Sequence, residues 1–293
     1  MMVLVTLLWS TAGVVTRWLS PPMQTDGRFE ITFWRALFAA IFIAGYLLFV
    51  RREGLRPVVA AGRAGLISGA MWGVMFSAFM LALSFTSTAN TLLVMSVGPL
   101  LTALLARAVL KTPVPLRTWL AIGAATIGMA WMFIFGGASV GAAHALGMLI
   151  AFAVPMASAI NLVTLNKVHA QVDLVPAVLI GGALAALAML PFALPLQAGA
   201  RDIALLALLG FFQLGLPCML MVRASKQLSA PEIALLALLE VLLGPLWAWL
   251  GAGEVPATAT LYGGALVIAA LVANEVAGLR RSTLDAPRAG ARA

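Results

Sequence analysis

The chain has 293 residues, of which 63% are hydrophobic and only 10% are charged, and its mean hydropathy is +1.06. A soluble domain is nearer half apolar and a quarter charged, so the composition excludes an ordinary soluble protein and indicates an integral membrane protein. In such a protein a net charge of +8 is more typical of cytoplasmic loops than of nucleic-acid binding.

Long apolar runs, separated by charges, prolines and glycines, predict an all-α membrane protein with ten transmembrane helices. A hydrocarbon core of about 30 Å needs about 20 apolar residues per helix. The runs are apolar all round rather than alternating, which favours helices over a barrel. The predicted spans are residues 2–20, 30–50, 63–83, 87–110, 115–135, 144–168, 173–195, 201–225, 229–251 and 257–279.

The basic residues predict that both termini are cytoplasmic. Of the 18 Lys and Arg residues, 14 then lie inside, while Arg17, Arg28 and Arg201 lie outside and Arg35 lies within the second span. This asymmetry is the positive-inside pattern. Residues 280–293 form a polar, basic tail that we expect to be cytoplasmic and disordered.

The sequence divides into two similar halves, residues 1–137 and 138–279. The fourth span and the ninth each begin with small polar residues and contain a Gly-Pro pair. Five spans per half is an odd number, so related halves must have opposite orientations, which is the inverted-repeat plan of many secondary transporters.

The Gly-Pro pairs are candidate hinges. A proline within a helix removes a backbone donor and frees a carbonyl one turn earlier. Pairs in matching positions of two halves indicate either bending around a central cavity or static packing kinks. The candidate hinge residues are Gly98, Pro99, Gly244 and Pro245.

Aromatic residues near the bilayer midplane predict an apolar cavity wall, with ordinary helix packing as the alternative. Most tryptophans fall near helix ends, as in an aromatic belt. Gly69 and Gly73 form a GxxxG motif on the third span, which predicts a close helix contact. The candidates for the wall are Trp9, Trp72, Phe76, Phe79 and Met80.

Few polar side chains lie deep in the predicted spans. Gln213 is near the middle of the eighth span and cannot satisfy its own amide, so it is a candidate for cavity lining. Asn90 starts the fourth span, and Ser10 lies in the first. Hydroxyls such as that of Ser10 often bond to carbonyls of their own helix, which is the structural alternative.

Glu240 is a carboxylate within the apolar run from Ile233 to Leu250. A charge at the bilayer centre costs at least about 2.5 kcal/mol, so it is expected to face protein or a water-filled path. Three roles fit: a proton carrier, a contact for a substrate cation, or a structural partner of donors at a broken helix. Arg35 is its candidate partner if the second and ninth spans meet.

The sequence contains no enzyme motif that we recognise, such as His-Glu-x-x-His, G-x-S-x-G or a phosphate-binding loop. His144 and His169 lie on opposite sides of the membrane, and Cys218 is the only cysteine. We therefore expect no catalytic residue, metal or cofactor. A membrane enzyme and a passive channel are the alternatives to a carrier, and a channel would need a more continuous polar lining.

Several motifs resemble the drug/metabolite transporter superfamily of the EamA type. They are LLWSTAGVVTRW, ITFWRALFAAI, SFTSTANTLLVMSVGPLLTALLARAVLKT and ALLEVLLGPLWAWLGAGEV, which together represent both halves. The last motif places Glu240 at the family's acidic position. Val241 follows it where the family usually has proline, and Lys111-Thr112 replaces a common acid in the first half.

The resemblance implies two inverted five-helix repeats around a substrate cavity, in a multi-pass protein of the bacterial inner membrane. It also implies export of small metabolites, and the chain looks most like the aromatic amino acid exporters. The expected partners are a small-molecule substrate, the lipid bilayer and, as a candidate coupling ion, protons, with no nucleic acid. Export of drugs or of other metabolites, including nucleotide sugars, is the alternative within the fold.

Overall fold

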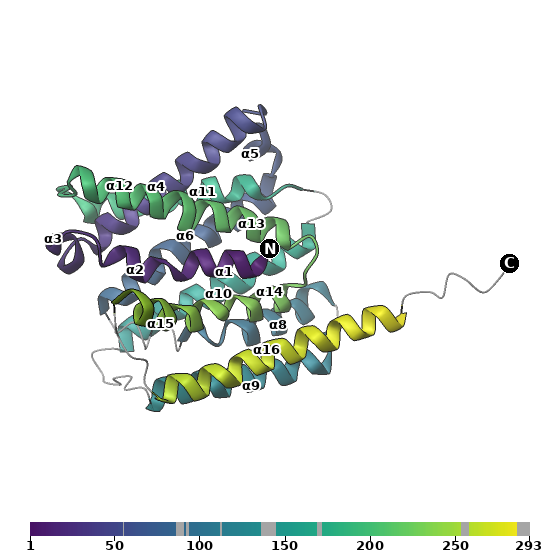
Figure 1. The fold of residues 1–293 in the computed structure, drawn as a ribbon. Coiled ribbons are helices and arrows are strands. Elements are labelled where there is room, and N and C mark those ends of the chain that lie inside the picture. Colours follow the sequence, from purple (N-terminus) through teal and green to yellow (C-terminus); the bar gives the residue numbers. More distant parts are fainter. Residues whose placement is uncertain are drawn as a thin grey trace.

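The protein is helical throughout the part that the computed structural model describes, with no strand among those residues (Figure 1). The described residues are 1–54, 56–85, 91, 94–111, 113–135, 145–168, 172–252 and 258–285. Five segments are long and apolar enough to cross a membrane, and Gly98–Leu110 and Leu261–Asn274 are shorter apolar helices. The five are Arg28–Val50, Gly62–Ala82, Leu146–Val168, Val175–Ala193 and Ala200–Ala224.

Most of the described helices fall within the predicted spans in chain order, two short ones lie between spans, and the predicted number of ten spans is not confirmed. The first half contains α1 (Met2–Ser10), α2 (Ala12–Thr16), α3 (Pro21–Thr25), α4 (Arg28–Gly45), the π-helix η1 (Tyr46–Val50), α5 (Arg56–Ala60), α6 (Gly62–Phe85), α8 (Gly98–Leu110) and α9 (Leu116–Phe135). The second contains α10 (Ala145–Val168), α11 (Val175–Ala193), α12 (Ala200–Leu208), the π-helix η3 (Leu209–Gly215), α13 (Leu216–Ala224), α14 (Ala230–Ala237), α15 (Leu239–Ala252) and α16 (Thr258–Asp285). Since α16 reaches Asp285, the start of the predicted tail is helical.

The first predicted span is divided at Thr11, between α1 and α2. The hydroxyl of Ser10 donates to the carbonyl of Leu7 at 2.8 Å, and that of Thr11 donates to the carbonyl of Leu8 at 2.7 Å. Such side-chain bonds compete with the helical backbone pattern and bend helices. The division therefore follows from two adjacent hydroxyl residues directly after Trp9.

The two Gly-Pro pairs occupy different places. Gly98 and Pro99 begin α8, where the missing proline N–H has no helical partner to lose. By contrast, α15 continues through Gly244 and Pro245, and the ninth predicted span divides at Leu238 instead. The break in this span is therefore next to Glu240 rather than at the Gly-Pro pair.

The predicted close contact of the GxxxG motif is confirmed, and its partner is α11. A Cβ atom added to Gly181 would lie 2.3 Å from Cβ of Trp72 and 2.9 Å from the carbonyl oxygen of Gly69. On the other side of α11, a Cβ on Gly182 would lie 2.8 Å from the carbonyl oxygen of Ala36 in α4. Helix α11 is thus held tightly between α4 and α6 because both neighbours approach its backbone.

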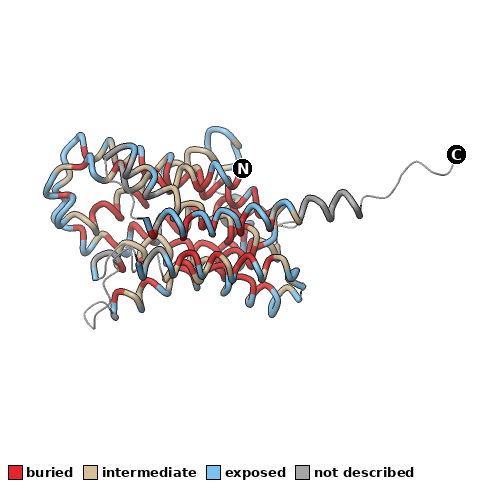
Figure 2. Tube along the Cα trace, turned by 60° about the horizontal axis from the view of Figure 1, so that its bottom comes forward, coloured by how far each residue is buried: buried red, intermediate tan, exposed pale blue. Residues whose placement is uncertain are grey.

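Helices α9 and α16 lie side by side along one edge of the bundle (Figure 1). A Cβ on Gly128 of α9 would lie 2.7 Å from the carbonyl oxygen of Gly263 in α16, so this pair also packs through glycine. Buried residues gather in the interior of the bundle, and exposed ones lie on its outer helix faces (Figure 2). Such outward apolar faces suit contact with lipid.

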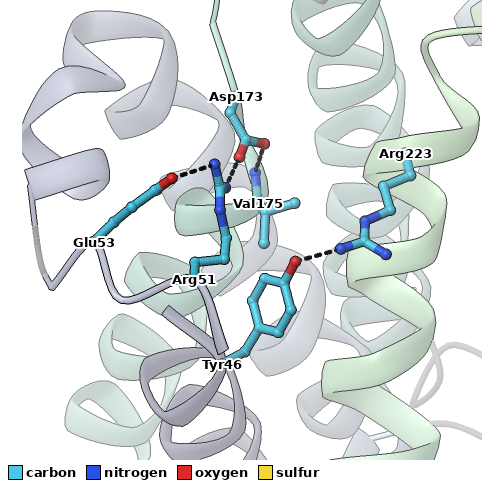
Figure 3. Close-up of polar contacts among 6 residues, drawn as sticks. All are labelled: Tyr46, Arg51, Glu53, Asp173, Val175 and Arg223. Atoms are coloured by element: carbon cyan, nitrogen blue, oxygen red, sulfur yellow. Dashed lines mark hydrogen bonds and ion pairs between the residues drawn. The ribbon is translucent and has the colours of Figure 1, made fainter. Parts of the chain in front are cut away.

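Polar contacts join helix ends where the chain leaves the apolar bundle. Arg51 binds Asp173 and also Glu53, the latter at 3.0 Å, while Arg223 donates to the hydroxyl of Tyr46 at 2.5 Å (Figure 3). Asp173 also accepts the backbone N–H of Val175 at the start of α11. Partial burial disfavours the charge of Arg51, but the hydrogen bond and charge of Asp173 outweigh it and raise the pKa of Arg51 above its ordinary value.

Two buried carboxylates fix connecting segments. Glu30 accepts the backbone N–H groups of Gln197 and Ala198 at 2.9 Å each. Asp202 accepts the backbone N–H and the hydroxyl of Ser20 at 2.9 and 2.7 Å. The start of α4 and the segment before α3 are thereby attached to the chain around α12.

Gly181→Ala is expected to lower the melting temperature of the protein, because the new methyl group would collide with Trp72. Overpacking of this kind typically costs about 1–3 kcal/mol. Gly123→Ala is the matched control, since a Cβ there meets nothing within 4 Å. Equal melting temperatures for the two variants in detergent would contradict close packing between α6 and α11.

Candidate functional site

A cavity of about 190 Å³ lies inside the bundle and is lined by residues of both halves. A water molecule needs roughly 10–15 Å³ of such space, so the cavity has room for a small organic molecule. Eight of the candidate residues from the sequence line it: Trp9, Trp72, Phe76, Phe79, Gly98, Pro99, Gln213 and Glu240. These residues come from α1, α6, α8, η3 and α15, and other residues of the lining come from α2, α4, α10, α13 and α14.

Helix α6 supplies the aromatic wall of the cavity. Trp72 has no solvent exposure, and its ring centroid lies 5.4 Å from that of Phe76. Gly181 on α11 leaves space behind Trp72. The aromatic side chains of α6 therefore both pack against neighbouring helices and line the cavity.

A chain of hydrogen bonds crosses the cavity wall from α4 to α1. A terminal nitrogen of Arg35 (Nη2) donates to the side-chain oxygen of Gln213 at 2.6 Å. The amide nitrogen of Gln213 in turn donates to the backbone oxygen of Trp9 at 3.1 Å. Arg35 is 8% exposed and Gln213 is 5% exposed, so these hydrogen bonds take the place of water for the two side chains inside the bundle.

Gln213 lies in the π-helical segment η3. Such segments insert one residue into a helical turn and are frequent at functional sites. Gly210 and Gly215 bring η3 close to α4, because Cβ atoms there would lie 2.4 Å from Phe38 and 2.8 Å from Phe42. This approach places the Gln213 amide within reach of Arg35.

Glu240 lies in the first turn of α15, directly after the break at Leu238, and is partly buried. Its charge and that of Arg35 attract one another, although among the described residues the two make no direct salt bridge. Helix α1 packs against both α15 and η3. The pairing of Arg35 with Glu240 that the sequence offered as a candidate is therefore not a direct salt bridge in the described part of the chain, although both residues line one cavity.

Ser10 and Met80 are candidates that are not among the described residues lining this cavity. Ser10 bonds to its own helix and accepts the indole N–H of Trp247 at 2.8 Å, which joins α1 to α15. Met80 accepts a 3.6 Å hydrogen bond from Arg35 through its sulfur. Gly244 and Pro245 are described only as part of α15, and Asn90 lies outside the described residues.

Several residues that line the cavity were not among the candidates from the sequence. Thr32, Met75, Met95 and Met221 carry no charge or motif that would have marked them. Met75 follows Trp72 by three residues on the same helix, so helical spacing alone could have identified it. Cys218 also lines the cavity, and it is buried.

No group of three or more His, Cys, Asp or Glu side chains that could hold a metal ion occurs within the described ranges. The cavity lining is mainly apolar, with Arg35, Gln213 and Glu240 as its strongly polar members. An arrangement of this kind can enclose a molecule that has an apolar body and a polar end.

Both the sequence and the fold are similar to those of known proteins. Residues 1–134 and 145–274 match the sequence model described as the EamA-like transporter family. A solved structure described only as "Crystal structure of protein" is similar in fold, with a TM-score of 0.78 and 18% identity over 94% of this chain and 96% of the other. The curated proteins give no match.

Gln213→Leu is expected to destabilise the protein because it removes the partner of a buried guanidinium. A hydrogen bond to a charged group is typically worth about 1.5–3 kcal/mol. Phe212→Leu is the control, since Phe212 lies in the same π-helix but is 53% exposed. A thermal unfolding midpoint that falls no further in Gln213→Leu than in the control would show that the bond contributes little.

Proposed function

The chain belongs to the EamA-like transporter family, and from that premise we propose that it is a secondary transporter exporting amino acids and related small metabolites by alternating access. Aromatic or other apolar amino acids are the proposed substrates. The proposed location is the bacterial inner membrane, with both termini in the cytoplasm.

The observation that carries this proposal is the cavity. It joins an aromatic wall, from Trp72, Phe76 and Phe79, to a polar end at Gln213 and Arg35. An amino acid with an apolar side chain has the same division into apolar and polar parts. Trp9 completes the proposed apolar wall, and the proposed role of Gln213 is to orient the polar end.

Two five-helix repeats, residues 1–137 and 138–279, are the proposed moving units. Pairs of equivalent helices from the two halves pack against each other, α4 with α11 and α9 with α16, which supports this division. The proposed flexible points are Gly98 and Pro99 at the start of α8, and Gly244 and Pro245 in α15. The break at Leu238 adds a further point beside Glu240.

Within the same fold, export of drugs or other metabolites is the second candidate. A passive channel is less well supported, because most of the cavity lining is apolar and offers no continuous polar path. A nucleotide-sugar carrier would need several deep cations, and among the described lining residues Arg35 is the only one.

Reconstituted protein is expected to move labelled phenylalanine or leucine into proteoliposomes, with saturable rates and acceleration by unlabelled amino acid on the opposite side. Empty liposomes provide the background. Flux that does not saturate and shows no counter-transport would indicate a channel. If no member of an amino acid panel moves above background, the amino acid proposal fails, and a drug panel becomes the next test.

Glu240→Gln is expected to retain the response of transport to a pH gradient, because the proposed role of Glu240, which lines the cavity together with Arg35, is to orient substrate rather than to carry a proton. Initial rates with and without the gradient measure this response. Loss of the gradient response, with exchange of amino acid for amino acid preserved, would identify Glu240 as the proton carrier instead.

A further inference from the structure

Two residues that line the cavity each carry a buried hydrogen-bond donor with no partner among the described residues. The donors are Nε of Arg35 and the indole nitrogen (Nε1) of Trp72. Buried polar groups in proteins are almost always hydrogen-bonded, so such groups at a cavity wall indicate that a ligand or water completes them. Arg35 comes from α4 and Trp72 from α6, and both helices are fixed by their packing on α11.

The chemistry of these donors defines their complement. Guanidinium and indole nitrogens donate and cannot accept, and the guanidinium is positively charged. Gln213 occupies one terminal nitrogen of Arg35, which leaves Nε for another acceptor. A carboxylate is the common group that accepts from arginine and carries the opposite charge.

Glu240 supplies a group of opposite charge to Arg35 in the lining of the same cavity. Its carboxylate accepts hydrogen bonds and attracts cations, and it interacts electrostatically with Arg35. A ligand with only a carboxylate would weaken the attraction between Arg35 and Glu240 and would provide no cation for the Glu240 carboxylate. A ligand with both a carboxylate and an ammonium group provides an opposite charge for Arg35 and for Glu240.

We propose that Arg35 and Trp72 form a carboxylate subsite and Glu240 an ammonium subsite, so that the cavity selects a zwitterion with an apolar side chain. The inference rests on the proposed transport function and assigns the residues that would give it specificity. Phe76 and Phe79 then lie along the apolar side chain of the ligand. Gln213 acts as a positioning residue because it holds the Arg35 guanidinium.

The test uses three ligands that differ only at their polar groups: phenylalanine, 3-phenylpropionate and phenethylamine. Binding to purified full-length protein is measured by titration calorimetry, and competition against labelled phenylalanine is measured in proteoliposomes. We expect phenylalanine to bind at least about tenfold more tightly than either analogue, the change produced by about 1.4 kcal/mol of lost interaction.

Variants assign the subsites separately. Trp72→Phe keeps an aromatic ring but removes the N–H. It is expected to weaken the binding of phenylalanine and 3-phenylpropionate, while the affinity for phenethylamine stays as in the unmodified protein. Arg35→Gln is expected to act in the same direction and more strongly, with Arg35→Lys restoring part of the affinity. Glu240→Gln should weaken the binding of phenylalanine and phenethylamine but not that of 3-phenylpropionate.

Two results would overturn the inference while leaving transport intact. The first is transport of phenylalanine with all three ligands binding equally well. The second is an equal fall in affinity for all three ligands in Trp72→Phe and Glu240→Gln variants that remain folded. Such a result would show that Trp72 and Glu240 serve packing or bind water rather than contact the polar groups of the ligand. Failure of every solute in the amino acid and drug panels, by contrast, would reject the transport proposal itself.

Discussion

The hydrogen bond from Arg35 to Gln213 constrains the centre of the structure. A guanidinium inside an apolar bundle needs a partner, because no bulk water is present to solvate it. Gln213 meets this need and is itself held by the backbone oxygen of Trp9, so α4, η3 and α1 are joined in one chain of contacts. The cavity lies beside this chain, and its polar end is therefore fixed in position by the same bonds that stabilise the bundle.

Glycine packing provides the second constraint, and it acts on the aromatic wall. Gly69 and Gly181 allow α6 and α11 to approach until their backbones nearly touch. Trp72 is then immobilised against α11, while Phe76 and Phe79 follow it along the cavity. The apolar wall on α6 thus shares one cavity with two residues of opposite charge, Arg35 and Glu240. This combination suits a molecule with distinct apolar and polar parts better than it suits an ion path.

The differences from sequence expectation have local causes. Matching Gly-Pro pairs predicted matching breaks, but Pro99 begins a helix whereas α15 passes through Pro245. The single helix expected at residues 2–20 divides at Thr11 because neighbouring hydroxyls bond to the preceding turn. Ser10, selected as a lining candidate, is instead used by Trp247 to join α1 to α15. Each outcome depends on which neighbour a side chain meets, and spacing along one helix does not contain that information.

The sequence by itself determined the membrane class, the succession of helices and most of the aromatic cavity wall, because apolar length and helical spacing are properties of single segments. It also marked Gln213 and Glu240, since strongly polar side chains within apolar runs are conspicuous. Only the tertiary structure decided that Arg35 binds Gln213, and that Arg35, Trp72 and Glu240 line one cavity, in which Arg35 and Trp72 carry donors with no partner among the described residues. The physical reason is that hydrogen bonding and charge attraction depend on distances between helices, which the packing of glycine against neighbouring backbones sets.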